Sequence, residues 1–262
     1  MKRWIPYVLL GMSFFVVFLL IQIPAVVGVS LIESFAKDTP LRQLRFYGVS
    51  GTIWNGQAKQ IVSAGQQFNS VSWNIHPGSL LLGRGSATIS FKSDGNRFSA
   101  RISQSLLGTT ILEGLEAKYQ MQDLIKLMQI PAVKLGGQIN LRLDELVFSD
   151  GTINSATGGV FWSRASSEFP QKVDLGDLKA TLDNTDDGVK AVLRDGGGPL
   201  ELNAELLLAE DGQFQLSGMM AAREGQGSSL ANSLRMMGKP NPQGKIVLKN
   251  SGNLSDFGFL LK

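Results

Sequence analysis

The sequence predicts a mainly β protein that one N-terminal transmembrane helix holds to a membrane. An uncharged segment of 29 residues follows two basic residues at the N-terminus, and polar and apolar residues alternate over much of the remaining chain. Only two short segments of that remainder show helical periodicity. We therefore expect a cytoplasmic head and anchor over residues 1–32 and a β-rich extracytoplasmic domain over residues 33–262.

The N-terminal segment has the length and charge pattern of a membrane anchor. No charged residue occurs between Trp4 and Ile32, and a helix of this length would extend about 44 Å, beyond the roughly 30 Å hydrocarbon core of a bilayer. Lys2 and Arg3 favour a cytoplasmic N-terminus, because positive charges that flank a membrane helix stay on the cytoplasmic side. A helix buried in a soluble core is disfavoured, since no face of this segment could meet water.

A cleaved signal peptide is the alternative interpretation of the same segment. Its apolar core would be Tyr7–Ile21, and small residues at 28–30 would offer a cleavage site. Apolar sequence continues beyond Pro24, however, which favours a retained single-pass anchor.

The composition of the exported part excludes several function classes. The whole chain carries a net charge of +3, and two of its basic residues belong to the anchor, so the exported part is nearly neutral. Lysine and arginine do not gather on one predicted element, so we expect no nucleic-acid partner. The chain has no cysteine, which rules out disulfides, a thiolate nucleophile and cysteine-bound metal.

Alternating residues predict strands throughout the exported part. Ala87, Ile89 and Phe91 share one face of a predicted strand, and an Asp-Gly pair at 94–95 separates it from a second strand over 97–103. The same alternation predicts strands at 138–143, 173–182, 189–193, 200–208, 214–220 and 245–249. Further Asp-Gly pairs, typical of hairpin turns, stand at 150–151, 187–188, 195–196 and 211–212.

Two short helices should cover parts of the core. Their apolar faces are formed by Met121, Leu124, Ile125 and Met128 in the first and by Leu230, Leu234 and Met237 in the second. The first helix either separates blocks at 40–118 and 132–262 or crosses over within one long sheet. Because two helices cover little of a one-sided sheet, the antiparallel sheet should curve on itself, as a sandwich, a barrel or a trough. A trough would leave an apolar lining free for a lipid chain or a protein partner.

No combination of residues predicts catalysis, a cofactor or a metal site. His76 is the only histidine, and it precedes a Pro-Gly turn. The carboxylate pairs Asp144-Glu145 and Asp186-Asp187 would point to opposite faces if they lay on strands, so turn or edge residues explain them better than a general acid-base pair. We therefore predict a protein that is not an enzyme.

Three tryptophans stand near glycine in predicted strands. Gly51-Thr52-Ile53-Trp54-Asn55-Gly56 precedes a second tryptophan in sequence, and a third repeats the Gly-x-x-Trp spacing at 159–162. Glycine beside an aromatic residue in a strand often marks a bend or a close backbone approach. The tryptophans are either core residues or part of a surface for a partner or lipid. The candidates for this fold or interaction motif are Gly51, Thr52, Trp54, Gly56, Trp73 and Trp162.

At these residues the chain resembles the type II secretion system protein N family of Gram-negative bacteria. The resemblance rests on the anchor, the Gly51–Gly56 motif, Trp73 with Pro77, the leucines at 80–82 and the Gly-x-x-Trp at 159–162. It implies an accessory subunit of the inner membrane whose N-terminus is cytoplasmic and whose main domain is periplasmic. Such a subunit would support export of folded proteins across the outer membrane through contacts with other secretion subunits, without enzymatic activity. The alternative is a periplasmic protein that binds or transfers lipid in a trough, which the one-sided apolar alternation favours.

Overall fold

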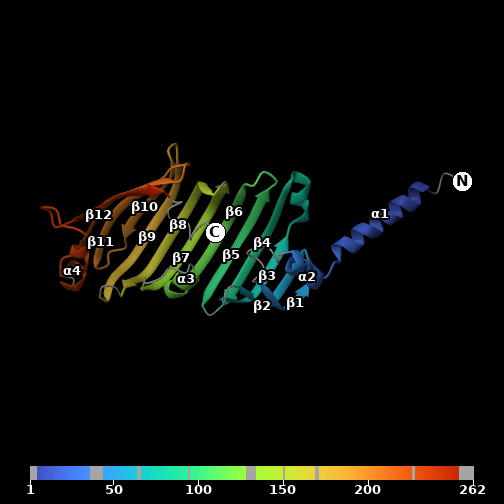
Figure 1. Ribbon diagram of the computed structural model, residues 1–262, viewed down its shortest axis with the longest axis horizontal. Helices are drawn as coiled ribbons and strands as arrows, with labels where there is room; N and C mark the ends of the chain where they lie inside the picture. The colour runs from blue at the N-terminus through green and yellow to red at the C-terminus, as the bar shows by residue number, and fades with distance from the viewer. Residues whose placement is uncertain are drawn as a thin grey trace. The chain divides into compact units, whose positions relative to one another are not determined.

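The computed structural model of the chain describes residues 5–35, 44–63, 66–93, 95–127, 134–149, 151–168, 171–225 and 228–253. The chain forms two compact units, Met1–Ser93 and Asp94–Lys262. Within each unit the strands follow one another in sequence order, and each strand pairs antiparallel with its sequence neighbours (Figure 1). The predicted mainly β fold class is confirmed in the form of open antiparallel sheets, not of a sandwich.

The apolar N-terminal segment folds as two helices, where the sequence predicted one. Helix α1 covers Ile5–Ile21, and α2 covers Ala25–Phe35. Pro24 explains the break, because a proline inside a helix removes a hydrogen bond and clashes with the preceding turn. No helix in the described ranges is long and apolar enough to cross a membrane. The single-pass anchor over residues 1–32 therefore stays a prediction.

The first unit contains the strands β1 to β4. Their bounds are β1 (Arg45–Gly51), β2 (Asn55–Ser63), β3 (Gln66–Ile75) and β4 (Arg84–Ser93), and a 3-10 helix, η3 (Pro77–Leu82), connects β3 to β4. Phe68 and Phe91 pack edge to face with their ring centroids 5.0 Å apart. Helix α2 lies against this sheet, and its Ala25 and Val29 side chains are buried.

The second unit contains the strands β5 to β13. Their bounds are β5 (Asn96–Ser105), β6 (Thr110–Gln120), β7 (Leu135–Ser149), β8 (Thr152–Ser167), β9 (Val173–Thr185), β10 (Gly188–Asp195), β11 (Leu200–Leu208), β12 (Gln213–Ala222) and β13 (Ile246–Asn253). Every strand predicted from alternation is therefore confirmed. Gly151, Gly188 and Gly212 have the positive φ expected of Asp-Gly turns. The chain also turns after Asp195, between β10 and β11, but Gly197 and not Gly196 takes the positive φ there. Asp94 and Asp150 lie outside the described residues.

Both predicted short helices are present in the second unit. Helix α3 (Met121–Leu127) connects β6 to β7, and these strands pair with each other from Gln120 opposite Gln138 onward. The helix thus joins two adjacent strands of one sheet. Helix α4 (Ser228–Met237) buries Leu230 and Leu234 against a core cluster of Val173, Leu200, Met220 and Ile246. Met128 and the side chain of Met237 lie outside the described residues.

Candidate functional site

Trp54 connects the first sheet to the N-terminal helices. It belongs to the short connection between β1 and β2, and its indole Nε1 donates a 2.8 Å hydrogen bond to the carbonyl oxygen of Leu20 in the last turn of α1. The last four carbonyls of a helix have no partner within the helix. The tryptophan therefore satisfies a group that would otherwise need water or another donor.

Backbone pairing reinforces this junction. The N–H of Ile53 donates to the carbonyl oxygen of Ile23 at 3.0 Å, and Pro24 forms an isolated antiparallel bridge with Thr52. The connection between α1 and α2 is thereby held against the loop that carries the Gly51–Gly56 motif. We call the contacts of residues 52–54 with residues 20–24 the helix-sheet junction.

Thr52 and the two motif glycines shape the loop itself. The N–H of Thr52 donates to the carbonyl oxygen of Asn55 at 2.9 Å, and the Asn55 N–H donates to Thr52 Oγ1 at 3.1 Å. Gly51 has a φ of +88°, which favours glycine over any residue with a Cβ. Gly56 lies opposite Trp73 in the β2–β3 ladder, and a Cβ on it would overlap the Trp73 ring. The motif glycines thus permit the tight turn and the close approach of the indole.

Trp73 also contacts the loop between β1 and β2. Its Nε1 donates a 3.0 Å hydrogen bond to the carbonyl oxygen of Ile53. The structure therefore brings five of the six sequence-predicted residues together, in one cluster around the β1–β2 connection of the first unit. The exception is Trp162, which lies on β8 of the second unit and donates to the Gly136 carbonyl oxygen at 2.9 Å. Its indole ties β8 to the start of β7.

An apolar cavity of about 340 Å³ lies between α2 and the first sheet. Side chains of α2, of all four strands and of the β1–β2 connection line it, and every lining residue is apolar or glycine. These residues are Ala25, Gly28, Val29, Leu44, Phe46, Ile53, Ile61, Val71, Trp73, Ile75, Ala87 and Ile89. Its volume falls at the lower end of the range of ligand pockets, about 300–1,000 Å³. The cavity can hold an apolar group but offers almost no polar partner for water.

The residues weighed for catalysis do not come together. The Nε2 atom of His76 lies 3.1 Å from Thr88 Oγ1, and Glu145 accepts a hydrogen bond from the Ser155 hydroxyl on the neighbouring strand. Asp186 and Asp187 are exposed in the β9–β10 turn. Within the described ranges, no group of three or more histidine, aspartate or glutamate side chains is placed to hold a metal ion.

Two side chains have shifted pKa values, both in the second unit. Burial raises the pKa of Tyr119 to about 12. Partial burial acts to raise the pKa of Asp195, but hydrogen bonds from the N–H groups of Leu202 and Gly197 and the charge of Arg223 hold it below its usual value. Asp195 therefore ties the end of β10 to the β10–β11 loop and to the residue after β12.

Comparison with known proteins assigns the family. The model of the family described as Type II secretion system (T2SS), protein N matches residues 42–249, a range that includes all six motif residues. The chain belongs to this family. The resemblance seen in the tryptophan motif is therefore confirmed.

Curated relatives in the Type II secretion system protein N family match nearly the full chain. The Type II secretion system protein N of Vibrio cholerae serotype O1 is 26% identical over 268 residues, covering 97% of this chain and 100% of the relative. The Type II secretion system protein N of Aeromonas hydrophila is 22% identical over 258 residues, with 97% and 100% covered. No solved structure matches this chain significantly.

The sequence did not indicate that residues 20–24 take part in the helix-sheet junction. Leu20 and Ile23 contribute only backbone carbonyls, so their side-chain identities carry no signal for this role. Gly28 was also missed, although a Cβ there would press against Ile53. The sequence suggested for it only the role of a small residue in a possible cleavage site at 28–30.

Proposed function

We propose that this chain is an accessory subunit of the type II secretion system that acts through contacts with other secretion subunits. The observation that carries the proposal is the family match over residues 42–249, together with relatives of that name matched along their whole length. The proposal includes no catalytic step. The scattered positions of His76 and the carboxylate pairs favour a binding protein over a hydrolase.

We further propose that the N-terminal segment attaches the protein to the inner membrane, with the sheets in the periplasm. The support is that the side chains of α1 from Tyr7 to Ile21 are exposed and that no charged residue occurs between Trp4 and Ile32. Apolar surface of this extent is stable in lipid and unfavourable in water. The motif around Trp54 would then fix the first sheet to the membrane-attached helix.

Deletion of the gene in the source bacterium tests the secretion role. We expect hydrolase activity to fall in the culture medium and to rise in the periplasm, and the wild-type gene on a plasmid to restore secretion. Undiminished secretion by the deletion strain would contradict the proposal. Attachment is tested separately by alkaline carbonate washing of the membranes, and release of the protein into the supernatant would argue against it.

A second function, lipid binding, is favoured by one observation, the wholly apolar cavity under α2. We expect a photoactivatable fatty acid, added to membranes that contain the full chain, to crosslink to residues of β3 and β4. Ala87→Leu, which fills part of the cavity, should lower the yield several-fold, whereas Ala180→Leu on β9 should not. Equal yields from both variants would count against a lipid site here.

A further inference from the structure

One row of side chains across the second sheet collects four cations. The strand register places Arg97 of β5 opposite Lys118 of β6, and Lys179 of β9 opposite Arg194 of β10. Directly paired residues of antiparallel strands point to the same face, so these side chains share one side of the sheet. The complete row, which we call the cation row, consists of Arg97, Lys118, Asn140, Phe161, Lys179 and Arg194.

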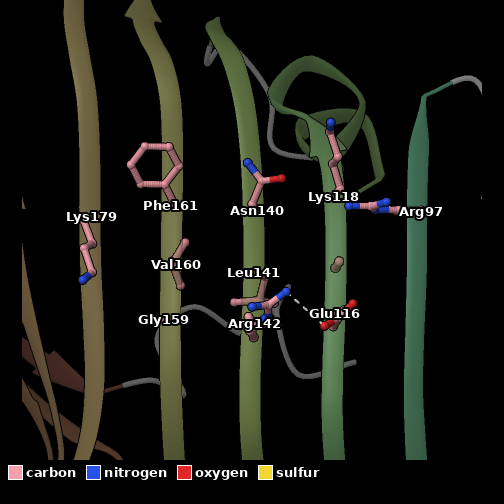
Figure 2. A pocket seen from close by; sticks show the side chains of 11 residues that line it. Arg97, Glu116, Lys118, Asn140, Leu141, Arg142, Gly159, Val160, Phe161 and Lys179 are labelled. Carbon is pink, nitrogen blue, oxygen red and sulfur yellow. Dashed lines mark ion pairs between the residues drawn. The ribbon is translucent and has the colours of Figure 1, made fainter. Parts of the chain in front are cut away.

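The cation row is open to solvent. Arg97, Lys179 and Arg194 are exposed, Lys118 is half-buried, and the ring of Phe161 is 40% exposed. Figure 2 shows five members of the row on the strands β5 to β9, where the side chains of Arg97, Lys118, Asn140, Phe161 and Lys179 line a shallow pocket of about 240 Å³. A ligand can therefore reach the charges and the aromatic ring together.

No ion pair within the described part of the chain involves any of the four cations. The carboxylates in the rows on either side already have partners. Glu116 pairs with Arg142 at 3.2 Å, Glu205 with Lys190 at 2.8 Å, Glu201 with Lys245, and Asp177 accepts from the Arg164 N–H. Within the described residues, no ion pair therefore neutralises a cation of the row.

Like charges directly opposite each other destabilise a sheet, and the cation row contains two such pairs. Arg97 faces Lys118, and Lys179 faces Arg194. An anionic ligand that lies across both pairs would remove the repulsion and gain two sets of charge-assisted hydrogen bonds. The arrangement therefore favours an anionic partner.

We propose that the cation row binds an extended acidic segment of a partner protein. Strands lie about 4.8 Å apart, so the row from Arg97 to Arg194 spans about 24 Å, the length of roughly seven residues of extended chain. Acidic residues at both ends of the segment would meet the two cation pairs, and an apolar residue at its centre would pack on Phe161. A single line of charge fits one strand of polypeptide better than a broad lipid surface. The choice of a protein as occupant rests on the proposed secretion function.

A synthetic peptide tests this proposal on the purified full-length protein in a non-ionic detergent. The probe is a fluorescein-labelled nonapeptide with two glutamates at each end, a central leucine and threonines between, and fluorescence anisotropy gives its Kd. We expect saturable binding that weakens as salt is raised, and none to a peptide with glutamine in place of glutamate. The double variant Lys118→Gln/Lys179→Gln should raise the Kd about tenfold.

A matched control separates the cation row from overall charge. Lys172→Gln/Lys239→Gln removes two exposed lysines elsewhere in the second unit and should leave the Kd unchanged. The row variant should keep its Tm or gain up to about 2 °C, because it relieves repulsion, so misfolding would not explain lost binding.

Equal affinity of the wild type and the row variant for the peptide would overturn the proposal. The proposal would also be overturned if the wild type, but not the row variant, bound soluble dihexanoyl phosphatidylglycerol while the peptide did not bind. The cation row would then be a membrane-binding surface. Neither result bears on the secretion assay of the deletion strain.

Discussion

The indole nitrogen of Trp54 donates a hydrogen bond to the carbonyl oxygen of Leu20, 34 residues earlier in the chain. This bond joins the last turn of α1 to the loop between β1 and β2. It makes the position of the N-terminal helix depend on a side chain of the motif that identified the family. The apolar N-terminal segment and the Gly51–Gly56 motif therefore belong to one structural unit.

Trp54→Phe should weaken the helix-sheet junction without abolishing it. The phenyl ring keeps most of the apolar contact but cannot donate to the Leu20 carbonyl, and loss of one hydrogen bond costs about 1 kcal/mol. We expect faster amide hydrogen exchange over residues 20–28. Trp162→Phe, which loses an equivalent bond in the second unit, serves as the control. Unchanged exchange in the Trp54 variant would show that the Ile53–Ile23 backbone bond is sufficient.

Gly56→Ala should destabilise the first unit. A Cβ at this position overlaps the Trp73 ring, and overpacking of this kind costs about 1–3 kcal/mol. Gly85→Ala on β4 is the matched control, since its Cβ would meet open space. Urea unfolding followed by tryptophan fluorescence should show a lower midpoint for the first variant alone. Equal midpoints would mean that Trp73 can move aside freely.

Asp195→Asn should lower stability at neutral pH by about 2 kcal/mol, because the charged form accepts the loop hydrogen bonds and pairs with Arg223. Its pKa in the folded state is below the usual 3.8, so the stabilisation is present above that pH and is lost as the pH falls through the lower folded value. The difference in Tm between wild type and variant should therefore be largest near pH 7 and shrink below about pH 4.

The control for this pH profile is Asp187→Asn, which neutralises an exposed carboxylate in the β9–β10 turn. Its Tm should follow the wild type at every pH. A pH-independent loss of stability in the Asp195 variant would indicate a steric defect and would contradict an electrostatic role.

Leu234→Ala in α4 should cost about 2–4 kcal/mol, because the side chain is 6% exposed and packs in the core cluster with Leu230. Met236→Ala in the same helix should change the free energy of unfolding by less than about 0.5 kcal/mol, since Met236 is 75% exposed. Thermal unfolding monitored by circular dichroism compares the two. Similar losses in both variants would mean that helix propensity, not core packing, determines the effect.

Local pattern was enough to predict the strands and the two short helices. A strand with one covered face repeats every two residues, and this period survives in Leu200–Leu208, which was predicted to the residue. Helix α2 was missed because apolar residues continue through Pro24, and composition alone then suggests one continuous segment. The turn after Asp195 is present, but Gly197 and not Gly196 has the positive φ. The Asp195 carboxylate accepts a hydrogen bond from the loop and pairs with Arg223.

The sites depended on information that local pattern does not carry. The Gly-x-x-Trp spacing indicated a close backbone approach, and Gly51 bears this out, because a Cβ there would overlap the backbone of Asn55. The target of Trp54 could not be inferred, because it is a backbone carbonyl on another element. The cation row was equally hidden, since its members stand 15 to 22 residues apart and meet only through strand register.

Pairing of each strand with its sequence neighbours also affects how the protein reaches its native state. Strand contacts within a unit join neighbours in sequence, so the loops that they close are short compared with the length of the unit and the contact order is low for a β protein. Each new hairpin can add to the growing edge without waiting for residues synthesised much later. A chain delivered N-terminus first is thus able to acquire its structure progressively, strand by strand, during its own delivery.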